Sequence, residues 1–133
     1  MRLLDTSVLA RWGDPDRKGE VVPYLQDHAD ERFVTSSLII FEFFRPVKRR
    51  DNRRQVQSWL GRVLDDVEPF TESASMTAAG VESRLREQDA ALEMRDLLIA
   101  AHARELGATF VTCDSGDFGS RRIQQLLDVD VVA

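Results

Sequence analysis

The chain has 133 residues, of which 43% are hydrophobic and 31% charged, as is typical of a soluble globular protein. We expect residues 1–133 to form a single domain. No apolar run approaches the roughly 20 residues of a membrane span. Asp5 comes too early for a signal peptide, so we expect a cytoplasmic protein. The net charge of −5 is unfavourable for nucleic-acid binding, which would require a local basic patch or a metal ion.

Short apolar segments alternate with longer helical patterns along the chain. Strands are expected at residues 2–4, 32–35, 66–70, 109–113 and 129–132. Helices are expected from Asp5 to Trp12 and at residues 18–29, 36–45, 53–64, 72–88 and 93–106, while residues 118–127 are helical or irregular. Alternation of this kind predicts an α/β fold, with a parallel sheet covered by helices on both faces. Ligands of such folds bind beyond the carboxyl ends of the strands.

Four acidic residues border apolar segments: Asp5, Glu42, Asp96 and Asp114. Each has a simple structural explanation. Asp5 is a good helix N-cap, Asp96 suits a first helical turn, Glu42 could pair with Arg45, and Asp114 could start a turn. A shared site explains all four acids together, and a divalent metal ion is the simplest compensating charge. Oxygen ligands favour Mg²⁺ or Mn²⁺ over zinc.

Other site chemistries fit the sequence less well. Both histidines, His28 and His102, are expected at the surface rather than as metal ligands. A receiver domain or a haloacid-dehalogenase-type phosphatase needs a late lysine, but no lysine follows Lys48. The phosphatase also needs a second acid where this chain has Ser7. No glycine-rich nucleotide loop follows the first strand, and no Ser/His/Asp arrangement has a supporting context.

One basic stretch interrupts the acidic chain. Six of the ten residues at positions 45–54 are basic, namely Arg45, Lys48, Arg49, Arg50, Arg53 and Arg54. These side chains either form a solvated corner between helices or bind a phosphate backbone.

Four segments in order, at residues 3–9, 36–42, 95–103 and 112–118, resemble the PIN domain, and in particular the VapC-type toxin ribonucleases. The resemblance implies a three-layer α/β/α sandwich with a central, mainly parallel sheet. It also implies that Asp5, Glu42, Asp96 and Asp114 bind one or two Mg²⁺ or Mn²⁺ ions as the catalytic acids. By the same likeness Asp117 is an auxiliary metal ligand, Ser7 and Thr112 orient carboxylates or water, and Phe118 packs in its loop.

The resemblance further implies a metal-dependent endoribonuclease that acts as the toxin of a toxin–antitoxin pair. Its expected partners are an RNA substrate, a cognate antitoxin protein and a second copy of the chain in a homodimer. The basic residues at positions 45–54 would then bind the RNA backbone. Two alternatives stay open: a non-catalytic PIN-like module that binds RNA or protein, and a PIN nuclease of RNA maturation.

Overall fold

A computed structural model describes residues 1–132. Its strands are β1 (Arg2–Leu4), β2 (Phe33–Ser36), β3 (Asp66–Glu68), β4 (Thr109–Thr112) and β5 (Val129–Val131). Its α-helices are α1 (Thr6–Gly13), α2 (Val22–Asp27), α3 (Ser37–Phe44), α4 (Arg50–Leu60), α5 (Glu72–Glu87), α6 (Met94–Glu105), α7 (Ser115–Phe118) and α8 (Arg121–Leu126). A short 3₁₀ helix, η1 (Lys18–Glu20), precedes α2.

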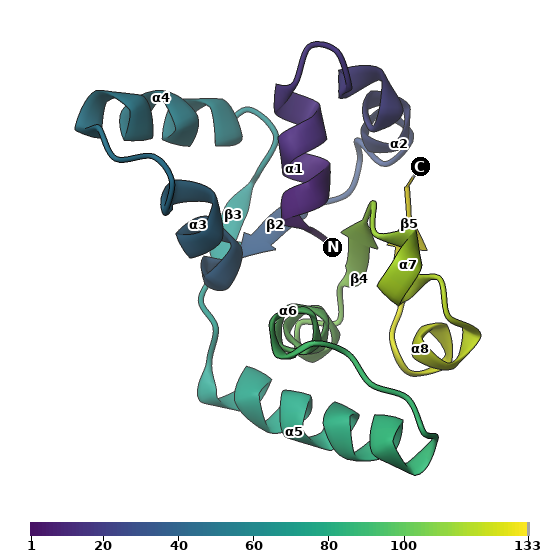
Figure 1. The fold of residues 1–133 in the computed structure, drawn as a ribbon. Coiled ribbons are helices and arrows are strands. Elements are labelled where there is room, and N and C mark those ends of the chain that lie inside the picture. Colours follow the sequence, from purple (N-terminus) through teal and green to yellow (C-terminus); the bar gives the residue numbers. More distant parts are fainter. Residues whose placement is uncertain (133) are drawn as a thin grey trace.

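The five strands form one parallel sheet in the order β3-β2-β1-β4-β5. The chain moves outward from β1 to β3, then returns across the sheet to β4 and β5. Because crossovers between parallel strands are right-handed, these two directions place helices on opposite faces. Figure 1 shows α1 and α2 on one side of the sheet, and α5 and α6 on the other. The predicted three-layer α/β/α sandwich is confirmed.

The strand order reverses between β1 and β4, which pair directly. Leu4 lies opposite Val111 at this junction, and the next amide, that of Asp5, donates to the Val111 carbonyl at 2.9 Å. Helices leave the two strands toward different faces here, and folds of this type form their ligand-binding crevice beyond the carboxyl ends at such a point. Asp5 follows β1 directly, and Asp114 follows β4 after one intervening residue. The fold therefore brings together acids that are far apart in the sequence.

Helix α6 lies between the sheet and α5, and it is buried on more than one face. Its buried residues are Asp96, Leu97, Ile99, Ala100, Ala101, His102 and Ala103. The alanines allow neighbouring backbones to approach closely, which is why no face of the central part is left to solvent. The prediction of a surface His102 is wrong, because this side chain is fully buried. Its Nδ1 lies 2.9 Å from Ser36 Oγ, and its ring meets the edge of Phe70.

Some element boundaries differ from the prediction. Pro23 lies in the first turn of α2, where proline is tolerated, so the segment divides into η1 and α2. Helix α4 covers residues 50–60 rather than 53–64, and the segment after β4 forms two short helices. Among residues 1–132, no helix combines the length and apolarity that crossing a membrane requires.

Candidate metal centre

Asp5 is the most firmly held of the candidate ligands. It is buried at the N-cap of α1, where its Oδ1 accepts from the Thr6 amide at 2.8 Å. Its Oδ2 accepts from Thr112 Oγ1 at 2.9 Å and from Ser7 Oγ at 3.3 Å. Ser7 and Thr112 also bind the backbone after β4, since Ser7 Oγ accepts from the Cys113 amide and Thr112 Oγ1 from the Asp114 amide. These bonds fix the Asp5 carboxylate relative to the β4–α7 turn.

Asp96 and Glu42 reach the crevice from helices on opposite faces of the sheet. Asp96 lies in the first turn of α6 and is buried. Glu42 lies on α3, and its side chain is 29% exposed. Thr6 Oγ1 donates to Glu42 Oε1 at 3.3 Å, which connects α3 to the start of α1. The alternative in which Glu42 pairs with Arg45 is not found among residues 1–132, where Glu42 contacts Thr6 and Arg95 instead.

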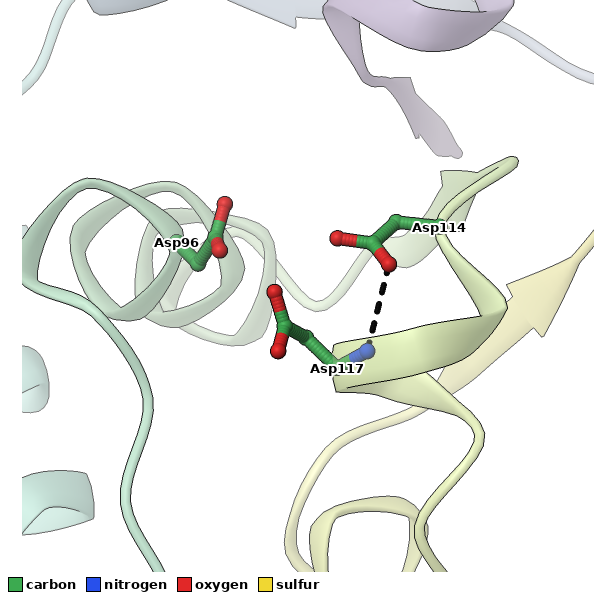
Figure 2. Close-up of side chains that lie close together, drawn as sticks. All are labelled: Asp96, Asp114 and Asp117. Atoms are coloured by element: carbon green, nitrogen blue, oxygen red, sulfur yellow. Dashed lines mark hydrogen bonds between the residues drawn. The ribbon is translucent and has the colours of Figure 1, made fainter.

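Asp114 and Asp117 belong to the turn that begins α7. Asp114 caps this helix, and its Oδ1 accepts from the amides of Gly116 at 3.0 Å and Asp117 at 3.1 Å. Figure 2 shows the carboxylates of Asp96, Asp114 and Asp117 pointing toward one shared space, with the Asp114–Asp117 hydrogen bond drawn dashed. One oxygen from each of these three carboxylates lies within 4.8 Å of the others.

Arg95 is the one prominent residue of the site that the sequence did not predict. Its Nε donates to both oxygens of Glu42, at 3.0 and 2.8 Å, and its Nη2 donates to Glu42 Oε1 at 2.9 Å. The same Nη2 donates to Asp5 Oδ1 at 2.8 Å, and Nη1 donates to Asp96 Oδ1 at 2.7 Å. One guanidinium thus contacts three of the four predicted acids. The sequence signal was an arginine directly before an acid in a first helical turn.

Charge interactions perturb two groups of the site. Partial burial lowers the pKa of Arg95, but bonds to Glu42, Asp5 and Asp96 outweigh it and raise this pKa above its usual value. The charge of Asp114, followed by a hydrogen bond with it, raises the pKa of the exposed Asp117 carboxyl. A cation beside Asp114 and Asp117 would relieve this repulsion. The donor set consists of carboxylate and hydroxyl oxygens, so it fits a hard divalent ion such as Mg²⁺ or Mn²⁺.

The predicted basic residues lie away from these acids, at the corner between α3 and α4. All six are exposed, namely Arg45, Lys48, Arg49, Arg50, Arg53 and Arg54. The Arg45 guanidinium lies over the Phe41 ring, 5.8 Å from its centroid, and Arg53 Nε donates to the Val47 carbonyl at 2.7 Å. Phe118 is fully buried against Phe110, so it packs its loop as expected.

Comparisons with known proteins identify the family and the fold of the chain. The family model described as PIN domain matches residues 2–121. A VapBC2 complex from Rickettsia felis, bound to a promoter DNA fragment, is 22% identical, with 99% of this chain and 98% of that chain covered and a TM-score of 0.76. FitAB bound to an IR36 DNA fragment is 24% identical, with 98% and 94% covered and a TM-score of 0.80.

A third solved structure is VapC20 from Mycobacterium tuberculosis, described as a sarcin–ricin loop cleaving toxin. It is 20% identical, with 83% of this chain and 87% of that chain covered and a TM-score of 0.54. No curated protein matches the chain. The likeness to these structures establishes the fold, and the family match covers most of the chain, including all five candidate acids.

Proposed function

Because the chain belongs to the PIN domain family, we propose that it is a divalent-metal-dependent endoribonuclease. One observation carries the proposal. Asp96, Asp114 and Asp117 each have one carboxylate oxygen within 4.8 Å of the others. Asp5 and Glu42, from other parts of the sequence, accept hydrogen bonds from the same guanidinium as Asp96, that of Arg95. Arg95 neutralises only part of this acidic group, and the oxygens of the carboxylates suit Mg²⁺ or Mn²⁺.

The residues present fit phosphodiester hydrolysis. A bound Mg²⁺ or Mn²⁺ would supply a water of lowered pKa and positive charge beside the departing oxygen. The chain's own contribution is to orient the ligands: Ser7 and Thr112 hold Asp5, and backbone amides of α7 hold Asp114. The water oxygen bonds to phosphorus while the bond to the 3′ oxygen breaks, so we propose products with 5′-phosphate and 3′-hydroxyl ends. Products with cyclic 2′,3′-phosphates would contradict this mechanism.

The proposed substrate is RNA, held in part by the basic corner between α3 and α4. Six exposed cationic side chains there form a local patch on an acidic protein. Such a patch attracts a phosphate backbone regardless of its sequence. The structurally similar VapC20 is described as a sarcin–ricin loop cleaving toxin, which makes structured RNA the first substrate to test.

We further propose that the chain is the toxin of a toxin–antitoxin pair and a homodimer. Two of the similar structures, VapBC2 and FitAB, are complexes with a second protein. An apolar surface near Glu42 suits such a partner: Phe41 is 63% exposed, Val67 is 44% exposed, and Ile40 and Phe44 line a hollow of about 430 Å³. Phe41→Ser should weaken binding of the cognate antitoxin, and light scattering should give the mass of a dimer.

The decisive experiment measures cleavage of a structured RNA pool by purified protein, with Mg²⁺, Mn²⁺ or EDTA. Asp96→Asn keeps the shape of the side chain but removes its charge, and we expect it to lower the rate by at least about 100-fold. Arg84→Gln on the exposed surface of α5 is the matched control, with an unchanged rate. Equal activity of wild type and Asp96→Asn in folded, antitoxin-free protein would contradict the proposal.

One observation favours the non-catalytic alternative. Arg95 already neutralises part of the acidic cluster, so the acids have a structural partner within the chain. A module that only binds RNA or protein could retain this ion-pair network for stability. It would show RNA binding without metal-dependent cleavage, so the same experiment distinguishes the two.

A further inference from the structure

We propose that Arg95 is an internal counter-cation that competes with divalent metal ions for Asp5, Glu42 and Asp96, so that complete metal binding requires its displacement. This inference rests on the proposed metal site. Arg95 belongs to this chain rather than to a partner protein, and it directly precedes Asp96, one of the acids that it contacts.

The contacts of Arg95 occupy the oxygens that a metal ion would use. Its three nitrogens lie 2.7 to 3.0 Å from carboxylate oxygens of Asp5, Glu42 and Asp96. Both oxygens of Glu42 are engaged. The planar guanidinium matches carboxylates with several donors at once, which makes these bonds stronger than those of a point charge. A divalent ion and Arg95 therefore cannot both make full use of the Asp5 and Glu42 carboxylates.

Arg95 contacts only some of the acids of the site. Within residues 1–132, the hydrogen bonds of Arg95 go to Asp5, Thr6, Glu42 and Asp96, and none reaches Asp114 or Asp117. The carboxylates of Asp96, Asp114 and Asp117 point toward one shared space, with one oxygen of each within 4.8 Å of the others (Figure 2). We infer that metal enters on this side and that ligation by Asp5 and Glu42 follows only when Arg95 leaves.

The side chain of Arg95 has a route for this movement. It is 34% exposed, whereas those of Asp5 and Asp96 are 5% and 10% exposed. Asp5 is held by hydrogen bonds to Ser7 and Thr112, and Asp96 is buried on α6, so the flexible arginine moves at lower cost than these two partners. Solvent contact also lowers the energy lost when the guanidinium leaves the carboxylates.

The test is the affinity for Mn²⁺, measured by isothermal titration calorimetry on wild type, Arg95→Gln and Arg84→Gln. Removing the competing charge should tighten Mn²⁺ binding by about tenfold or more in Arg95→Gln. Arg84→Gln makes the same charge change on α5 and should leave the affinity unchanged. In EDTA, Arg95→Gln should melt at a lower temperature than wild type, and Mn²⁺ should raise its melting temperature by more.

Two further variants secure the result. Arg95→Lys keeps the charge but loses the planar fork, so it should bind Mn²⁺ more tightly than wild type even if Arg95→Gln does not fold. Adding Glu42→Gln to Arg95→Gln should abolish most of the gain, because the freed carboxylate is its source. Equal Mn²⁺ affinity in wild type, Arg95→Gln and Arg95→Lys would overturn the inference.

The outcomes separate this inference from the proposed function. Tighter Mn²⁺ binding in Arg95→Gln, with no RNA cleavage by wild type at saturating Mn²⁺, supports the counter-cation and contradicts the nuclease. Metal-dependent cleavage by wild type, with equal Mn²⁺ affinities in all variants, supports the nuclease and contradicts the counter-cation. Absence of Mn²⁺ binding in every variant contradicts both.

Discussion

Helices α6 and α3 each carry one candidate acid to the crevice, but the two helices are held in different ways. Asp96 lies on α6, where seven residues are buried between the sheet and α5. Glu42 lies on α3, where Ile39 is the buried residue and Phe41 is 63% exposed. Asp96 is fixed by its buried helix as well as by its bond to Arg95, whereas Glu42 depends on polar contacts to Arg95 and Thr6. The same kind of ligand can thus be positioned by a core or by a few charged hydrogen bonds.

This comparison suggests that one half of the site is rigid and the other adjustable. The rigid half contains Asp5 and Asp96, which are buried. The adjustable half contains Glu42, on a helix that leads into the basic corner and the arm formed by α4. A partner protein or RNA bound to that arm would move Glu42 more readily than Asp96. Changes in stability should therefore be largest on the rigid side, and changes in binding should be confined to the arm.

The largest expected effect is on the α5–α6 layer. Leu85 of α5 is 1% exposed and packs in the main core, so Leu85→Ala should lower the free energy of unfolding by about 2–5 kcal/mol. Phe41→Ala removes a larger side chain from the exposed surface of α3, which leads into the arm, and should change the free energy of unfolding by less than about 0.5 kcal/mol. Denaturant unfolding measures both. Similar losses would mean that the arm is packed as firmly as the core.

The second effect concerns the contact between α1 and α4. A Cβ on Gly13 would lie 1.6 Å from Trp59 Cζ2, so Gly13→Ala forces α4 to move. We expect a loss of about 1–3 kcal/mol in unfolding free energy. Gly80→Ala is the matched control, because its Cβ meets nothing within 4 Å in the middle of α5. That change should stabilise the protein by about 0.5–1 kcal/mol, and a loss there would contradict an open environment at this position.

Local sequence signals predicted the frame of the site well, because they act over a few residues. The β1 strand and the Asp5 cap lie next to each other in the sequence, as do β2 and the Ser36 cap. The position of the acids at strand ends follows from parallel strands alone. These features needed no knowledge of which helix would pack against which.

Features that depend on packing between distant elements could not be predicted in this way. Whether Arg95 points to solvent or to Glu42 is decided by where α3 places that glutamate, 53 residues earlier. An isolated helix would leave His102 at the surface, but Phe70 and the end of β2 at Ser36 lie against it. The difference between the acids that Arg95 contacts and Asp114 and Asp117, which it does not contact within residues 1–132, likewise exists only after folding.

The buried His102 should make stability depend on pH. Burial lowers its pKa below the ordinary 6.5, while Glu105 and Glu68 oppose the shift only in part. Below pH 6.5 the unfolded chain therefore binds this proton more readily than the folded chain. Stability should be fully present above that pH and should fall as the pH drops toward the lower folded pKa.

His102→Asn tests this by keeping a group that can replace Nδ1 toward Ser36 without titrating. Between pH 7.5 and pH 5.5, the free energy of unfolding measured with denaturant should fall less for the variant than for wild type. An equal drop in both proteins would assign the pH dependence to other groups, such as the carboxylates of the crevice.

The smallest effect on stability is expected at the basic corner, where binding should change instead. Arg49, Arg50 and Arg54 are exposed, so converting all three to glutamine should alter the free energy of unfolding by less than about 0.5 kcal/mol. If these side chains neutralise phosphates of single-stranded RNA, the affinity should fall. The slope of log affinity against log salt should then shrink by about 0.7 for each phosphate that is no longer neutralised.

The matched control for the basic corner is Arg84→Gln with Arg86→Gln, which removes exposed charge from α5 on the rigid side. Nonspecific attraction would respond to net charge, so both variants would then lose affinity in proportion to the charges removed. If the RNA backbone instead binds at the α3–α4 corner, the slope of log affinity against log salt should be reduced only in the variant of Arg49, Arg50 and Arg54. Mn²⁺ affinity should stay unchanged in both variants, because neither touches the acids. A slope that stays at the wild-type value in the corner variant would place the RNA elsewhere and leave α3 free to serve the protein partner alone.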